Sequence, residues 1–311
     1  MDGNGNTVSS TWGIVLAGGS GRRLAPLTTR LYGQAIPKQF AVLCGRRSLL
    51  QQTIHRLSSL IPQSRLVVVV PREHDELARV QLASFQDIHV ITQPEDRGTG
   101  PGLALPLAWI RQRQRDANII VSPSDHFVRA WRPFLGGMRN ALECSMSGRL
   151  VLLGVCPEWA ETQYGWIVPG VAVGSRVRAV AAFTEKPSQQ QADELLRAGA
   201  LWNTLVFAGS VDLLWNVIEY RLPEQCAALQ SHFAYVDGGG PDLACQYRTM
   251  RAGDFSRDVL QATSDLGVVQ VLGSGWSDWG TPERVFASLV GSRRLEALED
   301  RLRRPNARAA E

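Results

Sequence analysis

Short runs of entirely apolar residues alternate with helix-patterned segments through the first half of the chain, and this alternation limits its possible folds more than any other feature. A strand that is apolar on both faces must be covered on both faces, which is typical of parallel sheets with helices on either side. The expected strands are residues 12–17, 65–70, 88–92, 117–121 and 150–155, and the expected helices are 48–60, 73–85, 102–113 and 131–146. The sequence therefore predicts an α/β fold with a doubly wound, mostly parallel, Rossmann-like sheet.

The second half of the chain is less regular and extends the same architecture. It predicts strands at 164–168, 176–184, 204–208 and 266–272, and helices at 189–198 and 211–220. Because no linker and no internal repeat interrupts the pattern, we expect one elaborated domain over residues 12–290. Residues 1–11 are polar and lack the apolar core of a secretory signal, so we expect a disordered lead-in. The charged residues 291–311 are expected to form a short helical appendage.

Composition excludes several classes of function. The net charge is only +4, and no basic run is interleaved with aromatic residues, so binding to a nucleic acid polymer is not indicated. The longest aliphatic run, residues 66–70, is too short to cross a membrane. The five cysteines are odd in number and scattered without a CxxC pair. They indicate buried thiols in a reducing compartment, which favours the cytoplasm over a disulfide framework or a zinc site.

Lysine is scarce in this chain. Of the 33 Lys and Arg residues, only Lys38 and Lys186 are lysines. A chain that uses arginine for generic positive charge will keep lysine where a compact ammonium is needed, because a planar guanidinium cannot replace it. The two lysines are therefore candidate functional residues, with chance retention as the alternative.

A glycine-rich turn directly follows the first expected strand. Its residues are Leu16, Ala17, Gly18, Gly19, Ser20, Gly21, Arg22, Arg23 and Leu24. Glycines let backbone N–H groups approach phosphate oxygens without a Cβ in the way, and the arginines add charge. The turn lacks the third glycine of a dinucleotide fingerprint and the Gly-Lys-Ser/Thr ending of a P-loop. Alone, it predicts either a phosphate site or a tight turn without a ligand.

Two proline-containing segments, Pro26-Leu27-Thr28 and Pro37-Lys38-Gln39-Phe40, follow this turn. Together with the turn they resemble the N-terminal signature of the sugar nucleotidyltransferases, and the second segment is most similar to that of the mannose-1-phosphate guanylyltransferases. The resemblance implies that residues 16–22 bind the nucleoside triphosphate, that Arg23 is the family arginine and that Lys38 contacts the phosphates. Arg22 stands where the family usually has Thr, and Ala25 where it has a larger residue, but neither change removes a charge.

Further segments continue the resemblance, in the family's order, from about residue 12 to residue 287. They are residues 94–101, 122–126, 163–167, 184–187, 202–203 and 277–281. The resemblance places Arg97 and Thr99 near the nucleoside, where Gly98 and Gly100 replace the family's Asn and Ala and leave the base preference open. It assigns Mg²⁺ to Asp125 and Asp278. It assigns the sugar to Gly165, Glu185, Lys186 and Asn203.

Each of these residues also has a plainer interpretation. Asp125 alone is more typical of a helix cap or turn, and Glu185-Lys186-Pro187 alone is typical of a solvated turn. Trp202 is equally compatible with the core, and His126 favours an orienting role over that of a base. Seven segments in the family's order are harder to explain as turns and caps, so the family interpretation is preferred.

The reaction implied by the resemblance converts a nucleoside triphosphate and a sugar 1-phosphate to a nucleoside diphosphate sugar and pyrophosphate, with GTP and mannose 1-phosphate as first choices. Because the attacking phosphate oxygen is already largely ionised near neutral pH, the site must mainly align two anions and neutralise their repulsion. The residues expected to be catalytic are Arg23, Lys38, Asp125, Lys186 and Asp278.

Three rival hypotheses stay open. A dinucleotide-dependent dehydrogenase needs an acidic residue closing the second strand, but this strand ends in Val70-Pro71-Arg72. A non-catalytic subunit that senses sugar nucleotides is the second, and intact Lys38 and Asp125 argue against it. The third is another substrate pair, such as dTTP, UTP or CTP with glucose 1-phosphate.

The family often carries a further C-terminal β-domain, whereas here residues 293–304 are expected to form either a dimer-contact helix, giving a homodimer, or a solvated helix.

Overall fold

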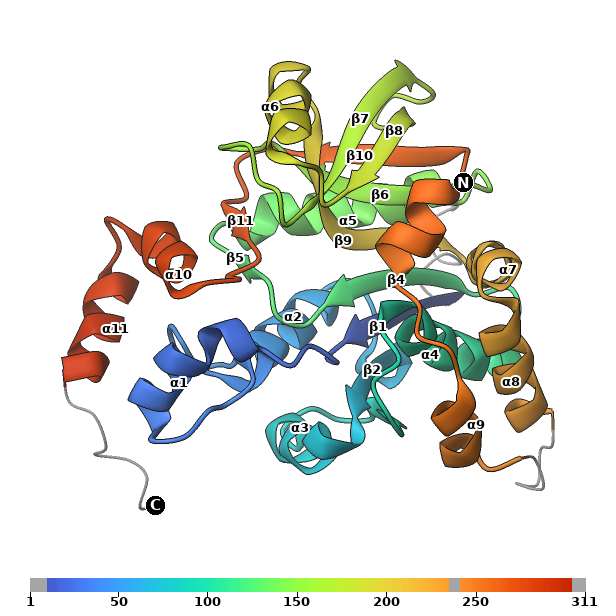
Figure 1. Cartoon of the computed structure of the whole chain (residues 1–311), viewed down its shortest axis with the longest axis horizontal. Helices are drawn as coiled ribbons and strands as arrows, with labels where there is room; N and C mark the ends of the chain where they lie inside the picture. The colour runs from blue at the N-terminus through green and yellow to red at the C-terminus, as the bar shows by residue number, and fades with distance from the viewer. Residues whose placement is uncertain (1–9, 235–240, 304–311) are drawn as a thin grey trace, which may run out of the picture.

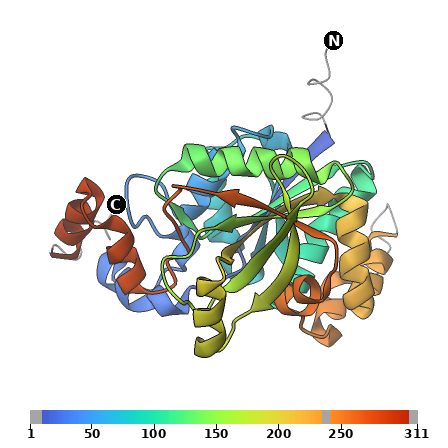
Figure 2. The ribbon, with the colours of Figure 1, turned by 90° about the horizontal axis from the view of Figure 1, so that it is seen from above.

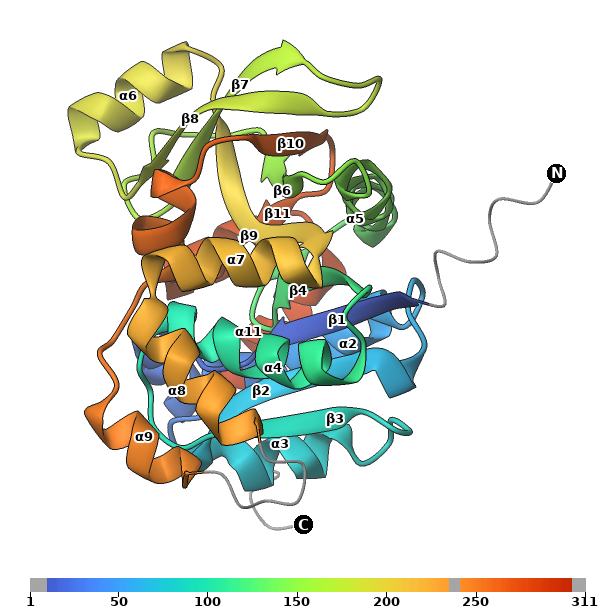
Figure 3. The ribbon, with the colours of Figure 1, turned by 90° about the vertical axis from the view of Figure 1, so that its right-hand side faces the viewer.

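A nine-stranded mixed sheet organises the computed structural model, which describes residues 10–234 and 241–303. Its strands, from one edge to the other, are β3 (His89–Gln93), β2 (Leu66–Pro71), β1 (Thr11–Leu16), β4 (Asn118–Pro123), β9 (Leu201–Ser210), β6 (Leu150–Val155), β10 (Leu266–Val271), β8 (Arg178–Glu185) and β7 (Gly165–Ala172). Figure 3 shows them rising in this order from β3 to the β7–β8 hairpin. The α/β class and the doubly wound architecture predicted from the sequence are confirmed.

Strand direction is mixed at the centre of the sheet and at one edge, where β8 runs antiparallel to both β10 and β7. β1 pairs in parallel with β2 and β4, β2 with β3, and β6 with β10, as expected. β9 lies between β4 and β6 and runs antiparallel to both. Its residues are nearly all buried, like those of its parallel neighbours, so an apolar pattern could not reveal its direction.

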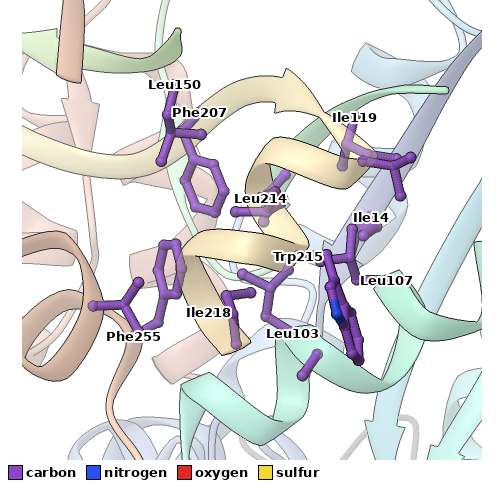
Figure 4. Close-up of a cluster of buried hydrophobic side chains, with 14 of the residues drawn as sticks. Ile14, Leu103, Leu107, Ile119, Leu150, Phe207, Leu214, Trp215, Ile218 and Phe255 are labelled. Atoms are coloured by element: carbon purple, nitrogen blue, oxygen red, sulfur yellow. The ribbon is translucent and has the colours of Figure 1, made fainter. Parts of the chain in front are cut away.

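Helices cover both faces of the sheet. On one face lie α4 (Thr99–Arg113), α7 (Val211–Arg221) and α8 (Pro223–Phe233), and on the other lie α2 (Leu49–Leu57), α3 (Asp75–Leu82) and α5 (Trp131–Ser145). Alternate residues of each strand enter opposite layers: Ile14 of β1 packs with α4, and Val15 packs with α2. Figure 4 shows the first layer, where Trp215 and Ile218 of α7 face Leu103 and Leu107 of α4.

Several elements differ from the sequence prediction. Four short helices were not predicted: α1 (Ala25–Tyr32), α8, α9 (Leu243–Thr249) and α10 (Pro282–Leu289). Three of them have a proline in the first two positions, which suits a helix start but also suits a turn. A two-stranded sheet of β5 (Phe127–Val128) and β11 (Trp276–Ser277) is too short to give a periodic signal. The predicted helix at 189–198 is α6 (Gln189–Arg197), with a capping box at Ser188.

A third apolar cluster joins the start of the chain to its end. It includes Leu24 and Leu27 around α1, Trp279, and Leu298 of α11 (Arg293–Arg303). Figures 1 and 2 show α10 and α11 beside α1 at one end of the molecule. The helix expected in the charged tail is thus present, and its apolar face packs within the same chain.

The ends of the chain are described only in part. Of the predicted lead-in, residues 1–9 lie outside the described residues, and Thr11 already belongs to β1. Residues 304–311 of the predicted tail also lie outside. In the described portion, none of the helices has both the length and the apolar character needed to span a membrane.

Candidate functional site

A cleft of about 370 Å³ opens where β1 and β4 end. These two strands are paired in register, Leu16 opposite Pro123, so the loops that follow them lie side by side. The lining residues are Leu16, Gly18, Gly19, Ser20, Val69, Gln93, Asp96, Gly98, Thr99, Gly102, Pro123, Asp125, His126, Leu205 and Asp254. The cleft therefore lies at the carboxyl edge of the parallel strands, where open α/β sheets bind their ligands.

The glycine-rich turn forms one wall of this cleft. Gly18, Gly19 and Ser20 line it, and Ala17 is buried beneath them. Gly21 has a φ of +61°, and a Cβ there would lie 2.5 Å from the backbone nitrogen of Lys38, so only glycine fits without displacing that segment. Arg22 and Arg23 are exposed and lie outside the cleft lining, at the start of the turn that leads into α1.

A buried glutamine supports the turn from below. Gln39, only 1% exposed, donates hydrogen bonds from Nε2 to the carbonyl oxygens of Ala17 (3.1 Å) and Gly19 (2.7 Å). With these two carbonyls turned inward, the backbone of the turn is fixed before any ligand arrives. Sequence reasoning gave Gln39 no role, and only its place beside Lys38 pointed to it.

Lys38 joins the two predicted metal-binding aspartates. Its Nζ lies 2.8 Å from Oδ2 of Asp125 and donates a hydrogen bond of 2.5 Å to the backbone carbonyl of Asp278. Asp125 follows β4, whereas Asp278 follows β11 and is 153 residues further along the chain. The structure thus brings together three residues that the sequence could associate only by resemblance.

Both carboxylates are held in the ionised form. Burial would raise the pKa of Asp125, but the positive charge and hydrogen bond of Lys38 outweigh it, so this pKa lies below its usual value. Burial likewise opposes ionisation of Asp278, and the charge of Lys38, the hydroxyl of Tyr164 and the guanidinium of Arg284 bring its pKa below the usual value. The site therefore contains two anions and one ammonium before substrates bind.

His126 stays neutral in this environment. Burial lowers its pKa to about 4, although Asp125 attracts the protonated form. Its Nδ1 accepts a hydrogen bond of 3.2 Å from Nε1 of Trp276, so this nitrogen carries no proton. This geometry is consistent with the orienting role expected for His126.

The predicted sugar-binding residues gather beside the cleft on β7, β8 and β9. Gly165 is paired with Glu185 across the hairpin, and a Cβ at residue 165 would lie 2.6 Å from Oε2 of Glu185 and 3.3 Å from Cβ of Asn203. Lys186, 57% exposed at its side chain, has its Nζ 3.8 Å from Oε1 of Glu185. Burial raises the pKa of Glu185 to about 7 despite the charge of Lys186. Glycine at 165 keeps the space above this carboxyl group open.

Strained backbone marks the same region. Among the described residues, five other than glycine have a positive φ, and three of these lie around the site: Lys186 (47°), Leu205 (53°) and Trp279 (47°). Leu205 lines the cleft, and its N–H donates to Oδ1 of Asn203 (3.1 Å). Such conformations cost free energy and persist where the surrounding structure fixes them, often at functional sites.

Trp202 lies in an aromatic cluster. It is 3% exposed and packs edge-on against Tyr164 and Trp159, with ring centroids 5.1 and 4.8 Å away. This burial supports the core interpretation of Trp202, while Asn203 next to it faces Gly165.

Arg97 is not among the residues that line the cleft. Its guanidinium donates to the backbone carbonyls of Tyr247 (2.7 Å) and Arg248 (2.9 Å), and pairs with Glu95 (2.6 Å). The structure therefore gives Arg97 a role in anchoring α9, and its predicted contact with the nucleotide has no support in this geometry. Thr99 does line the cleft, where its hydroxyl accepts the N–H of Phe255 (2.8 Å).

Besides Gln39, sequence reasoning missed the roles of Gln93, Tyr164 and Arg284. Gln93 ends β3, lines the cleft and is 4% exposed, and its Nε2 has no hydrogen-bond partner among the described residues. Its place at the end of a strand, like that of Asp125, was the available signal. Tyr164 and Arg284 hold Asp278 through hydrogen bonds of 2.5 and 3.0 Å to its Oδ1, and Arg284 lies in a helix that the sequence did not predict.

The fold and the cleft together define an α/β protein of the doubly wound type, with a glycine-rich turn in the cleft and two ionised carboxylates linked by Lys38. Residues 12–289 match the model of the Nucleotidyl transferase family, and the chain belongs to this family.

Individual relatives agree with this assignment. The chain is 31% identical over 279 residues to the mannose-1-phosphate guanylyltransferase RfbM of Salmonella typhimurium, covering 86% of this chain and 56% of that protein. It is 31% identical over 293 residues to the mannose-1-phosphate guanylyltransferase of Escherichia coli K12, covering 88% and 58%. A crystal structure described as mannose-1-phosphate geranyltransferase from Thermus thermophilus superposes with a TM-score of 0.78 at 28% identity, covering 89% and 79%. The chain thus spans little more than half the length of these curated relatives.

Proposed function

We propose that this chain transfers a nucleotidyl group from a nucleoside triphosphate to a sugar 1-phosphate, releasing pyrophosphate. The observation that supports the proposal is that Lys38 links Asp278 to Asp125, and that Asp125 lines the same cleft as the glycine-rich turn. GTP and mannose 1-phosphate are the first choices, because the similar proteins from Salmonella typhimurium and Escherichia coli are named mannose-1-phosphate guanylyltransferases.

The donor set suits a divalent cation such as Mg²⁺. Asp125 and Asp278 supply hard oxygen ligands, both ionised, and the ammonium of Lys38 already lies between Asp125 and the Asp278 backbone. No group of three or more His, Cys, Asp or Glu side chains suited to a metal occurs among the described residues. The protein therefore offers few ligands, as is usual for Mg²⁺ bound together with substrate phosphates. Bound Mg²⁺ would neutralise phosphate charge and polarise the α-phosphate.

The remaining work falls to groups of this chain. In the proposed mechanism, Gly19, Ser20 and Gly21 direct backbone N–H groups to the β- and γ-phosphates, with Arg23 adding charge at the outer end. Lys38 moves its ammonium onto the triphosphate, and Lys186 holds the incoming phosphate as a point charge. Glu185 accepts hydrogen bonds from sugar hydroxyls, and Asn203 can both accept hydrogen bonds from them and donate to them. Catalysis then consists of alignment and charge neutralisation, without a side-chain base.

Gln93 is our candidate for contact with the base. Its unpartnered Nε2 offers a donor to a base acceptor such as guanine O6 or uracil O4, and its Oε1 offers an acceptor. A glutamine is thus compatible with more than one base, which keeps dTTP, UTP or CTP with glucose 1-phosphate as the second candidate.

A substrate panel tests the proposal. Each of the four nucleoside triphosphates is mixed with Mg²⁺ and either mannose 1-phosphate or glucose 1-phosphate, and pyrophosphate release is measured. We expect release to depend on both substrates and to be fastest with GTP and mannose 1-phosphate. Tight binding of a nucleoside diphosphate sugar without release from any pair would instead support the non-catalytic sensing protein.

Compartment and assembly belong to the same proposal. We propose a cytoplasmic enzyme, because five scattered free cysteines suit a reducing compartment. If the chain associates, we propose a homodimer that forms through the charged face of α11. Light scattering of the purified protein distinguishes this homodimer from a monomer.

A further inference from the structure

Arg284 occupies an unusual place behind the site. It lies in α10, its side chain is 14% exposed, and its guanidinium lies 4.9 Å from the centroid of the Tyr164 ring. Nη1 donates to both carboxylate oxygens of Asp278, at 3.0 and 3.1 Å, and to the hydroxyl of Tyr164 at 3.1 Å. Nη2 pairs with Oε2 of Glu161. One side chain thus links α10, the Asp278 turn and the loop before β7.

The two oxygens of Asp278 are used unequally. Oδ1 accepts from the Tyr164 hydroxyl (2.5 Å), the Gly280 N–H (2.9 Å) and Arg284. Oδ2 accepts only from the forked Nη1 of Arg284 among the described residues. Since each carboxylate oxygen has about two lone pairs, Oδ1 is saturated and Oδ2 keeps capacity for another ligand.

Glu161 fixes Arg284 from the opposite side. This carboxylate is 7% exposed, and its Oε1 accepts the N–H of Gln163 (2.8 Å). Its Oε2 also accepts from Nε1 of Trp159 (3.0 Å). With Glu161 neutralising its charge, Arg284 can orient Asp278 without cancelling the negative charge of the Asp278 and Asp125 pair.

We propose that Arg284 is a positioning residue that occupies Oδ1 of Asp278 and presents Oδ2 to the divalent cation bound with the triphosphate. The inference rests on the proposed function in one respect, which is that a nucleoside triphosphate is the molecule bound together with the cation. Groups that orient a metal ligand typically change metal affinity or activity about 10- to 100-fold when removed.

Direct cation binding tests this inference without turnover. Tb³⁺ prefers oxygen ligands, and Trp276 and Trp279, which flank Asp278, can sensitise its luminescence. Tb³⁺ is titrated into the protein alone and displaced with Mg²⁺. We expect Arg284→Gln to weaken the binding of both ions about tenfold, with Arg284→Lys recovering part of the loss. In Arg149→Gln we expect no change, since Arg149 forms a similar pair with Asp265 (2.5 Å) at the opposite end of the strands.

A second variant guards against simple loss of stability. Arg284→Gln leaves the buried carboxylate of Glu161 unpaired, which destabilises the fold. The double variant Glu161→Gln, Arg284→Gln removes both charges, and we expect it to stay folded. We expect this double variant to bind the cations as weakly as Arg284→Gln does, because Arg284 no longer orients Asp278. Unchanged or tighter binding in either variant would overturn the inference. If the wild type binds Tb³⁺ as expected but no substrate pair releases pyrophosphate, the proposed function fails and the inference about Arg284 stands.

Discussion

At the scale of single residues, Asp125 is the most direct test of the site. Its carboxylate pairs with Lys38 at 2.8 Å in the cleft. We expect Asp125→Asn to lower kcat at least about 100-fold, the scale seen when a charge-stabilising group is removed, while circular dichroism stays that of the folded protein. An unchanged rate at saturating Mg²⁺ would remove Asp125 from the mechanism.

Lys186 tests the argument from lysine scarcity. It keeps a left-handed backbone and an exposed ammonium beside Glu185. Lys186→Arg preserves the charge but replaces a point charge by a planar group. We expect the KM for the sugar 1-phosphate to rise about tenfold, equivalent to about 1.4 kcal/mol, with little change in the KM for the nucleotide. Full tolerance of arginine would show that the lysine is retained by chance.

The raised pKa of Glu185 predicts that both stability and binding of the sugar 1-phosphate depend on pH. Its pKa of about 7 in the folded protein is higher than the value of 4.5 for a free side chain, because burial disfavours the charge. The unfolded chain ionises first, so this group's contribution to stability falls as pH rises from about 4.5 to 7. Sugar hydroxyls donate better to the ionised form, so we expect the KM for the sugar 1-phosphate to fall as pH rises through 7.

Glu185→Gln supplies the control for this profile. The substrate phosphate also titrates, with a pKa near ~6, and it does so for both proteins. The part of the pH dependence that centres near 7 should disappear in Glu185→Gln. A profile identical to that of the wild type would assign the titration to the phosphate alone.

How far the sequence predicted the site depends on the residue. The scarcity of lysine alone points to Lys38 and Lys186, and the ends of the parallel strands predict where ligands gather. Gln39, Gln93 and Arg284 were not predicted, because their roles come from contacts that only the folded chain makes. Arg97 shows the limit of a motif, since its place in the sequence does not give the partners of its side chain, which here are the backbone carbonyls of Tyr247 and Arg248.

At the scale of elements, the segment before α4 depends on contact with a distant loop. Gly98 has a φ of +85°, and a Cβ there would lie 2.5 Å from the carbonyl oxygen of Gly253. The N–H of Gly100 donates to that same oxygen (2.9 Å). Thus the replacement of the family's Asn at residue 98 by glycine allows this close backbone approach.

A pair of glycine variants measures how much this close contact at residue 98 limits the size of its side chain. Gly98→Ala should lower the free energy of unfolding more than Gly148→Ala, by about 1–3 kcal/mol, in chemical denaturation. Gly148 has the same φ of +85° but open space around it, so it controls for backbone strain. Equal losses would show that the segment and residue 253 can move apart at no cost.

Elements were predicted best where their pattern was long. The parallel strands and the longer helices agree with the sequence to within a few residues, since burial on both faces or on one stripe leaves a period. The direction of β9 and the helices α1 and α10 were not predicted. Direction depends on the connections between strands, and a helix of eight residues has too few turns to show a period.

At the scale of the whole molecule, the chain's end supports its beginning. Leu298 of α11 is 1% exposed in the cluster that includes Leu24 and Leu27, where the glycine-rich turn ends and α1 begins. Truncation to alanine should cost about 2 kcal/mol or more of unfolding free energy, as for other buried leucines. Because the lost packing lies under α1, we also expect a higher KM for the nucleotide with little change in that for the sugar 1-phosphate. Leu272→Ala makes the same change at a leucine that is 66% exposed, and should alter neither quantity. A destabilised Leu298→Ala with an unchanged KM for the nucleotide would mean that α11 stabilises the fold without holding the turn in place.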